Sequence, residues 1–161
     1  VQIQPQNQEA HLFLGTLYAE RRDFDKAIDH LKALVGIDPR SLMGHYYLAR
    51  VYAETKRFDE AKSHYQTALL IKPHFEPALL DLALIHEIQQ ETEKAIQIYK
   101  NILAINPSNA EAHDRLGQVY IRQKKLSEAL NEFQAVEKLT INNSEVRTKI
   151  GLIYFEQGRL D

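Results

Sequence analysis

Seven histidines are the residues of this sequence with the widest chemical range, because imidazole binds metals and transfers protons near neutral pH. One fixed interval separates His11 from His45, and twice that interval separates His45 from His113. In a helical fold this spacing places them on different helices, about 10 Å apart, whereas a metal ion needs ligand atoms about 2 Å away. His30 and His64 are separated by the same interval and are expected on the outer face of another helix. The pattern predicts packing and surface histidines and no metal site.

No other group of residues suggests catalysis. The chain contains no cysteine, which excludes disulfides, zinc–thiolate sites and cysteine nucleophiles. We find no spacing typical of a nucleophile with its base, no carboxylate pair outside the general acidic surface, and no glycine-rich phosphate loop. The sequence therefore predicts a protein that is not an enzyme and has no cofactor.

The composition narrows the class of partner. The 161 residues include 20 Lys and Arg against 22 Asp and Glu, a formal net charge of −2. This balance gives no general attraction to nucleic acids or anionic membranes. No apolar run approaches the roughly 18 residues that a membrane-spanning helix needs. With 6 glycines and 5 prolines the chain has few turn residues, which favours long helices joined by short connections.

One repeating interval of about 34 residues organises the whole chain. It is set by four of the five prolines, Pro5, Pro39, Pro73 and Pro107, each with isoleucine two residues before it. A period of this length is the signature of a stacked-repeat protein. When Gln8 is counted as position one, the eighth position is always small and the twentieth is always alanine. These two columns are Gly15, Ala49, Ala83, Gly117 and Gly151, and Ala27, Ala61, Ala95 and Ala129.

The columns predict two helices of roughly 13 residues in each repeat. Positions four, seven, eight and eleven share one helical face, and positions twenty, twenty-four and twenty-seven share another. The small residues allow two helix backbones to approach closely, and the proline ends the second helix. Polar residues after the proline are expected to cap the next helix, with Phe75 interrupting this column. The expected caps are Asn7, Ser41, Asn109 and Asn143.

This pattern strongly resembles the tetratricopeptide repeat (TPR) family. The resemblance implies an all-α fold, a right-handed α-solenoid of antiparallel helix pairs that forms one array over residues 1–161. The expected repeats are residues 1–7 as the tail of a preceding repeat, full repeats at 8–41, 42–75, 76–109 and 110–143, and 144–161 as the first helix of a further repeat. Because both ends fall inside a repeat, we expect a fragment of a longer array.

The resemblance also implies a concave groove that binds a peptide or helix of a partner protein. The family's groove positions are two, five, six, nine, twelve and thirteen of each repeat. The residues expected to bind are Leu12, Phe13, Thr16, Tyr46, Tyr47, Arg50, Leu80, Asp81, Leu84, Ile88, Arg115, Gln118 and Arg122. Many are apolar although they lie off the core stripe, which is typical of a contact surface. The alternative is that they pack between successive first helices.

The charges in this groove indicate which ligand it suits. The family's clamp for acidic chaperone tails needs lysine and asparagine where this chain has Leu12 and Thr16. The first three repeats offer one base, Arg50, and five acids in the groove: Glu9, Glu20, Glu54, Asp81 and Glu87. We therefore expect a non-catalytic scaffold that binds an apolar or amphipathic segment with basic flanks.

Two other functions remain open at this point. The chain could be a structural module that stacks end to end in a larger complex, for example in secretion, pilus or polysaccharide-export machinery. The apolar residues Ile150, Tyr154 and Leu160 lack a second helix to cover them, and we expect weak end-to-end self-association. RNA-binding pentatricopeptide repeats have a slightly longer period and need a basic groove, so the period and the acidic groove of this chain argue against nucleic acid.

Overall fold

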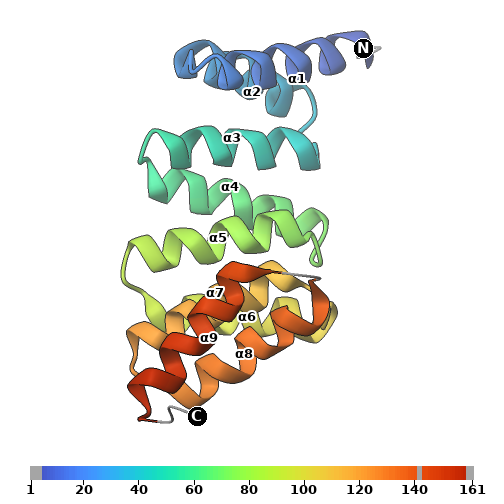
Figure 1. The fold of residues 1–161 in the computed structure, drawn as a ribbon. Coiled ribbons are helices and arrows are strands. Elements are labelled where there is room, and N and C mark those ends of the chain that lie inside the picture. The colour runs from blue at the N-terminus through green and yellow to red at the C-terminus, as the bar shows by residue number, and fades with distance from the viewer. Residues whose placement is uncertain (1–4, 141–142, 159–161) are drawn as a thin grey trace. The chain divides into compact units, whose positions relative to one another are not determined.

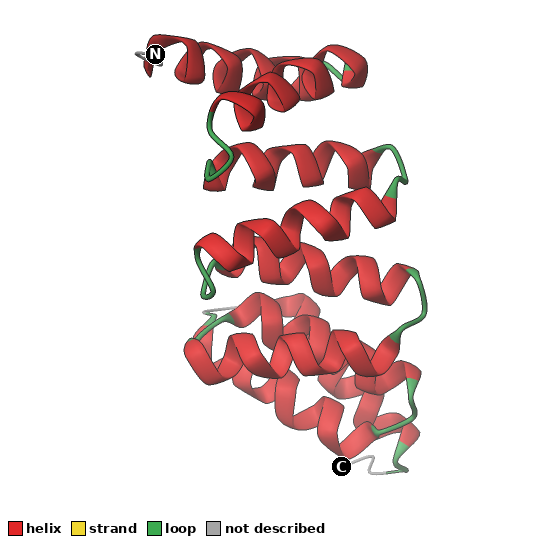
Figure 2. Cartoon of the chain, turned by 180° about the vertical axis from the view of Figure 1, so that it is seen from behind, coloured by secondary structure: helices red, strands yellow, loops and turns green. Residues whose placement is uncertain are grey.

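The computed structural model describes residues 5–140 and 143–158, which form nine α-helices and no strand. Figures 1 and 2 show these helices joined by short loops. They are α1 Pro5–Glu20, α2 Phe24–Ile37, α3 Leu42–Glu54, α4 Phe58–Ile71, α5 Glu76–Ile88, α6 Thr92–Ile105, α7 Ala110–Arg122, α8 Leu126–Leu139 and α9 Ser144–Glu156. The predicted all-α class is confirmed. Within the described ranges no helix has the length and apolar character needed to span a bilayer.

The chain divides into two compact units, Val1–Ile85 (unit 1) and His86–Asp161 (unit 2). In unit 1, α1 packs against α2 and α3 packs against α4, while α3 also contacts α1 and α2. In unit 2, α7 packs against α8, α6 contacts α7, and α9 contacts α8. Within each unit consecutive helices run antiparallel, as the two-helix repeat predicts (Figure 1). The position of the missing fifth proline, residue 141, lies outside the described residues.

Three of the four predicted helix caps are confirmed. Each of these side chains accepts a hydrogen bond from the backbone N–H three residues later; the caps are Ser41, Asn109 and Asn143. The predicted cap at Asn7 is wrong, because α1 already begins at Pro5 and Asn7 lies inside the helix. A proline is well tolerated at the first helical position, since its missing N–H would have no partner within the helix.

The small-residue columns mark the closest approach of the two helices in a pair. All four alanines of position twenty are 0% exposed. A Cβ added to Gly15 would lie 2.6 Å from Leu31 Cγ, and one added to Gly117 would lie 2.9 Å from the Phe133 ring. The predicted close packing is therefore confirmed in both units. The equivalent point beside Gly151 has no atom within 4 Å, since no described helix follows α9.

The turn inside each helix pair has one recurring backbone conformation. The second residue after the first helix is left-handed in all four described turns: Arg22, Lys56, Gln90 and Lys124, with φ of 59–60°. Gly158, with φ of 68°, occupies the equivalent position after α9. The residue after the left-handed one donates its N–H to the first helix, as Asp23 does to the Tyr18 carbonyl. This bond turns the chain back so that the second helix packs on the first.

Candidate interaction surface

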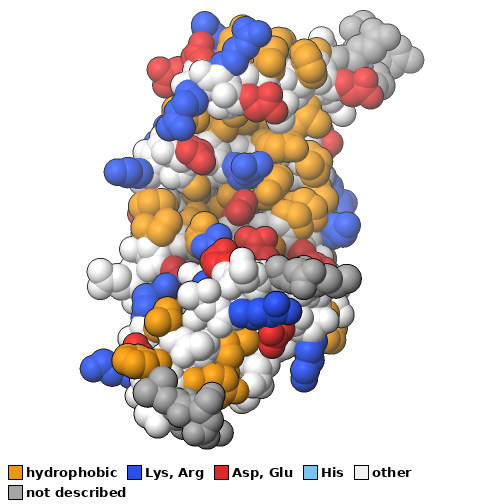
Figure 3. All heavy atoms as spheres, viewed as in Figure 1, with side chains coloured by type: hydrophobic (Ala, Val, Ile, Leu, Met, Phe, Trp, Pro, Cys, Tyr) orange, Lys and Arg blue, Asp and Glu red, His pale blue; other side chains and the backbone are white. Residues whose placement is uncertain are grey.

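The predicted binding residues all remain at least partly accessible. We call those on unit 1 the unit 1 surface: Leu12, Phe13, Thr16, Tyr46, Tyr47, Arg50, Leu80, Asp81 and Leu84. The remaining four, Ile88, Arg115, Gln118 and Arg122, belong to unit 2. Phe13 is 66% exposed and Ile88 is 57% exposed. Figure 3 shows hydrophobic side chains gathered over α3 and the neighbouring part of α5, with single charged residues between them. Whether these residues bind a ligand remains a prediction.

Aromatic rings form the centre of the unit 1 surface. The Tyr46 ring lies 5.3 Å from that of Tyr47 and meets Phe75 edge to face at 5.2 Å. The Arg50 guanidinium lies 5.8 Å from the centroid of the Tyr46 ring. Burial, reinforced by the charge of Asp81, raises the pKa of the Tyr46 hydroxyl to about 12. The Tyr46 phenol therefore stays neutral over a wide pH range.

Asp81 is the acidic residue nearest to this cluster, and its charge is already compensated. Its Oδ2 accepts a 3.0 Å hydrogen bond from the Tyr65 hydroxyl, and the Arg50 guanidinium lies 4.0 Å away. Burial and the adjacent carboxylate raise the pKa of Tyr65 above its ordinary range, so this phenol stays a donor. Asp81 therefore shares its charge with neighbouring side chains, and its role in binding a ligand stays a prediction.

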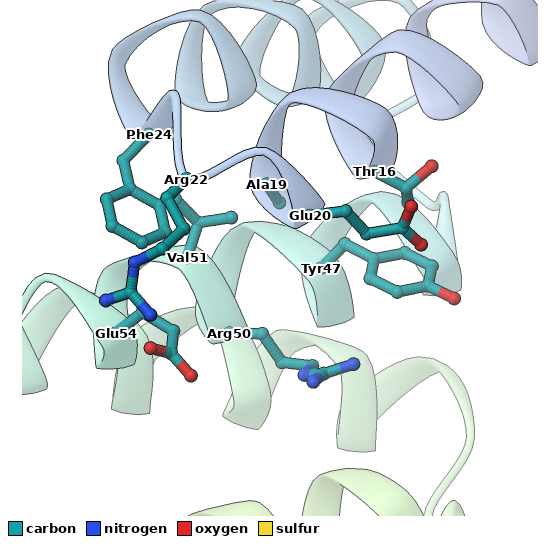
Figure 4. Close-up of a pocket in the computed structure, with 9 residues that line it drawn as sticks. All are labelled: Thr16, Ala19, Glu20, Arg22, Phe24, Tyr47, Arg50, Val51 and Glu54. Carbon is teal, nitrogen blue, oxygen red and sulfur yellow. The ribbon is translucent and has the colours of Figure 1, made fainter.

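An open cavity of about 450 Å³ lies between α1 and α3 (Figure 4). Its lining is Thr16, Ala19, Glu20, Arg22, Phe24, Tyr47, Arg50, Val51 and Glu54. The two glutamates occupy the same position of successive repeats. Neither Glu20 nor Glu54 makes an ion pair with another described residue. The cavity thus combines apolar side chains with two glutamates and two arginines, Arg22 and Arg50, and neither glutamate is held in a direct ion pair with a described residue.

In unit 2 the charges of the predicted groove pair with one another. Glu87 accepts hydrogen bonds from the Tyr99 hydroxyl at 2.5 Å and from the Arg122 guanidinium. Burial and the carboxylate of Glu87 raise the pKa of Tyr99. The Lys149 ammonium lies 2.8 Å from Asp114 Oδ1, which links α9 to α7. These partners therefore satisfy each other's charge within the predicted groove of unit 2.

The structure also reveals histidine pairs that the sequence analysis missed. The Nδ1 atoms of His11 and His30 are 3.1 Å apart, and those of His45 and His64 are 2.9 Å apart. The prediction that His30 and His64 lie on an outer face is therefore wrong, because each contacts the first helix of its own pair. The signal in the sequence was the offset between the two members, which is the same in both pairs. No group of three or more His, Asp or Glu side chains suited to a metal occurs in the described ranges.

Comparison with known proteins identifies the family. The tetratricopeptide repeat model matches residues 19–84 and 88–153. No curated protein matches the chain. Among solved structures, MamA superposes with a TM-score of 0.84 at 20% identity, covering 96% of this chain and 85% of MamA. PilF of Pseudomonas aeruginosa superposes with a TM-score of 0.82 at 22% identity, covering 96% of this chain and 70% of PilF.

A third similar structure is YrrB, described as a TPR protein with an unusual peptide-binding site. It gives a TM-score of 0.74 at 17% identity, covering 94% of this chain and 78% of YrrB. At these identities the likeness shows the fold alone. The family model, in contrast, matches well over half of the sequence and agrees with the helix pairs, the buried alanine column and the recurring turn. The chain belongs to the tetratricopeptide repeat family, whose fold serves as a scaffold for protein–protein interaction.

Proposed function

We propose that the unit 1 surface binds an apolar or amphipathic segment of a partner protein that carries basic flanking residues. The protein acts in this proposal as a non-catalytic scaffold. The observation that carries it is the placement of exposed apolar side chains beside an open cavity lined by two glutamates that form no direct ion pair with the described residues. YrrB, which has a peptide-binding site, adds support by analogy of fold.

The apolar part of the proposal depends on residues that the core does not use. Phe13 is 66% exposed, and Tyr47, Leu80 and Leu84 keep part of their side chains in contact with solvent. Aromatic and aliphatic side chains of this kind anchor most protein interfaces when a partner covers them. A segment with apolar residues at helical or alternate spacing would bury them together.

The charge part of the proposal depends on the cavity. Asp81 is compensated by Tyr65 and Arg50, which leaves Glu20 and Glu54 as the carboxylates available near Tyr47. A lysine or arginine of the partner would find them within the same cavity. An acidic segment would instead meet two like charges, which disfavours binding.

Fluorescence anisotropy with two labelled probe peptides tests this function. Both peptides carry the same amphipathic leucine and phenylalanine core, one with lysine flanks and the other with glutamate flanks. We expect the lysine-flanked probe to bind at least about tenfold more tightly, and the Tyr47→Ala/Leu84→Ala variant to lose about tenfold or more. Leu70→Ala is the matched control, because Leu70 is 84% exposed on α4 and outside the surface. Equal binding of both probes, or an equal loss in the control variant, would contradict the proposal.

End-to-end self-association is the second candidate, and one feature of α9 favours it. Tyr52 and Tyr120 are 3% and 7% exposed, whereas Tyr154 at the equivalent position of α9 is only half-buried. The point beside Gly151, which Leu31 or Phe133 fills in the complete pairs, is open; Leu160 lies outside the described residues. A helix from a second copy would fit beside Gly151. Sedimentation equilibrium should show weak dimerisation that Gly151→Lys abolishes, and a strict monomer at high concentration would exclude this candidate.

A further inference from the structure

Position four of the repeat contacts position twenty-three of the same repeat, across the turn between its two helices. Both residues are histidine in the two complete helix pairs of unit 1, His11 with His30 and His45 with His64. In unit 2 the equivalent pair is His113 with Glu132, whose Nδ1 and Oε2 atoms are 2.6 Å apart. One structural contact between first and second helix is thus made by two imidazoles in unit 1 and by an imidazole and a carboxylate in unit 2.

Hydrogen bonding fixes how many protons the His45–His64 pair can hold. The Nε2 of His45 lies 3.1 Å from the Pro39 carbonyl oxygen, which can only accept, so this nitrogen carries a proton. In the neutral ring the Nδ1 of His45 is then the acceptor, and the Nδ1–H of His64 donates to it across 2.9 Å. One further proton can bind at His64 Nε2 without breaking this bond. A second one would place two N–H groups face to face, and the pair would have to separate.

The His113–Glu132 pair responds to protonation in the opposite way. The Nε2 of His113 lies 3.0 Å from the Pro107 carbonyl oxygen, as the Nε2 of His45 does from that of Pro39. Its Nδ1 faces a carboxylate, which accepts only, so a proton on each imidazole nitrogen strengthens the contact. Protonation of histidine therefore supports this pair, whereas an imidazole pair is disrupted once both rings are protonated.

We propose that the two imidazole pairs make the helix pairs of unit 1 acid-sensitive, so that α1–α2 and α3–α4 open on mild acidification while α7–α8 stays closed. The sign follows from proton counting. Below about pH 6.5 an unfolded imidazole pair binds two protons, whereas the folded pair accepts one. Because the open state then binds one proton more, its equilibrium constant rises about tenfold for each pH unit of acidification.

On balance, the surroundings of His64 disfavour its protonation. Burial, the facing His45 and the Lys32 charge on α2 together lower the pKa of His64, against the smaller influence of Glu60. Tyr52 stacks on His64 and already has the Arg57 guanidinium 4.4 Å from its ring centroid; Arg57 also pairs with Glu60.

The first pair shares the stacked tyrosine and its neighbouring cation. Tyr18 stacks on His30 at 5.5 Å and has the Lys26 ammonium 5.2 Å from its ring centroid. Lys26 in turn pairs with Asp23 at 2.8 Å. In each pair a lysine or arginine cation already lies near the ring of the stacked tyrosine. A new positive charge on the imidazole would repel this cation.

Hydrogen exchange measured by mass spectrometry on the whole chain tests the proposal helix by helix. After correction for the intrinsic pH dependence of exchange, we expect the opening constants of α1–α4 to rise about tenfold between pH 6 and pH 5. Those of α7 and α8 should change less than about twofold. An equal rise in both units, or no rise in α1–α4, would overturn the proposal.

Exchanging the second residue of the pairs separates this mechanism from general acid instability. His64→Glu gives α3–α4 the pairing of unit 2 and should abolish its rise between pH 6 and pH 5. Glu132→His gives α7–α8 an imidazole pair and should create a rise of about tenfold there. His74→Glu is the matched control at an exposed histidine between α4 and α5, and it should leave the wild-type pattern unchanged. If His64→Glu leaves the pH dependence of α3–α4 unchanged and Glu132→His creates none in α7–α8, the imidazole pairs are not its cause.

Discussion

The Tyr65 hydroxyl of α4 donates a 3.0 Å hydrogen bond to Asp81 Oδ2 of α5. Tyr65 is 1% exposed, whereas Asp81 belongs to the unit 1 surface, so this bond connects the core to the proposed binding face. Tyr65→Phe keeps the ring and removes only the hydroxyl. We expect a loss of about 1 kcal/mol in the free energy of unfolding, because Asp81 is partly solvated and regains water. Urea denaturation measures this loss of stability. Tyr18→Phe is the control, because it removes the same hydroxyl from a tyrosine that stacks on His30.

Alkaline pH should destabilise unit 1 through Tyr46. Its pKa is raised to about 12 in the folded protein, mainly by burial, against about 10 in an unfolded chain. The neutral phenol is thus favoured by folding, and its contribution is complete below pH 10 and lost as the pH rises through about 12. Urea midpoints of wild type should fall more steeply over this range than those of Tyr46→Phe. Identical slopes for the two proteins would contradict the assignment.

The alanine column should not tolerate a larger side chain. Ala95 is 0% exposed, as predicted from its place in the column, so a larger side chain would have to fit among packed atoms. Ala95→Leu should cost roughly 1–3 kcal/mol through overpacking. Ala104→Leu, at an exposed position of the same helix, should stay within about 0.5 kcal/mol of wild type. A denaturation midpoint of Ala95→Leu equal to that of wild type would show that the core can rearrange.

Two glycines at the same position of different repeats should respond with opposite signs to the same substitution. In Gly117→Ala the new Cβ would meet the Phe133 ring at 2.9 Å, and we expect destabilisation of about 1–2 kcal/mol. In Gly151→Ala it meets no atom within 4 Å, and alanine should stabilise α9 by about 0.5–1 kcal/mol. Thermal denaturation of both variants provides the comparison, and a shared sign would refute the packing explanation.

The column pattern was sufficient to predict the fold because each column reports a helix face. Periodic small and apolar positions identified both helices of every pair, and Ala61 and Ala95 are buried where the pattern places them. The start of α1 was not predicted, since the proline that ends other second helices begins this one. A proline is compatible with both roles, so its position alone does not decide between them.

The partner of each polar side chain was harder to predict than its helix face. The His45–His64 contact joins residues on either side of a turn, and no period within one helix relates them. In the same way, Glu87 was counted among the open acids of the groove, although it is held by Tyr99 and by Arg122 from the next first helix. Such contacts depend on the offset between packed helices, which only the three-dimensional arrangement supplies.

The recurring left-handed turn has a consequence for how such a chain can evolve. Arg22, Lys56, Gln90 and Lys124 show that the turn does not require glycine, since polar residues with different side chains adopt it. Each of these four turns joins its helices in the same way, and the turns recur at the same interval along the chain. A gene duplication or deletion of one whole interval therefore keeps the reading frame and rejoins two compatible helices. The number of repeats can change in one genetic event, while the surface residues of each copy diverge separately.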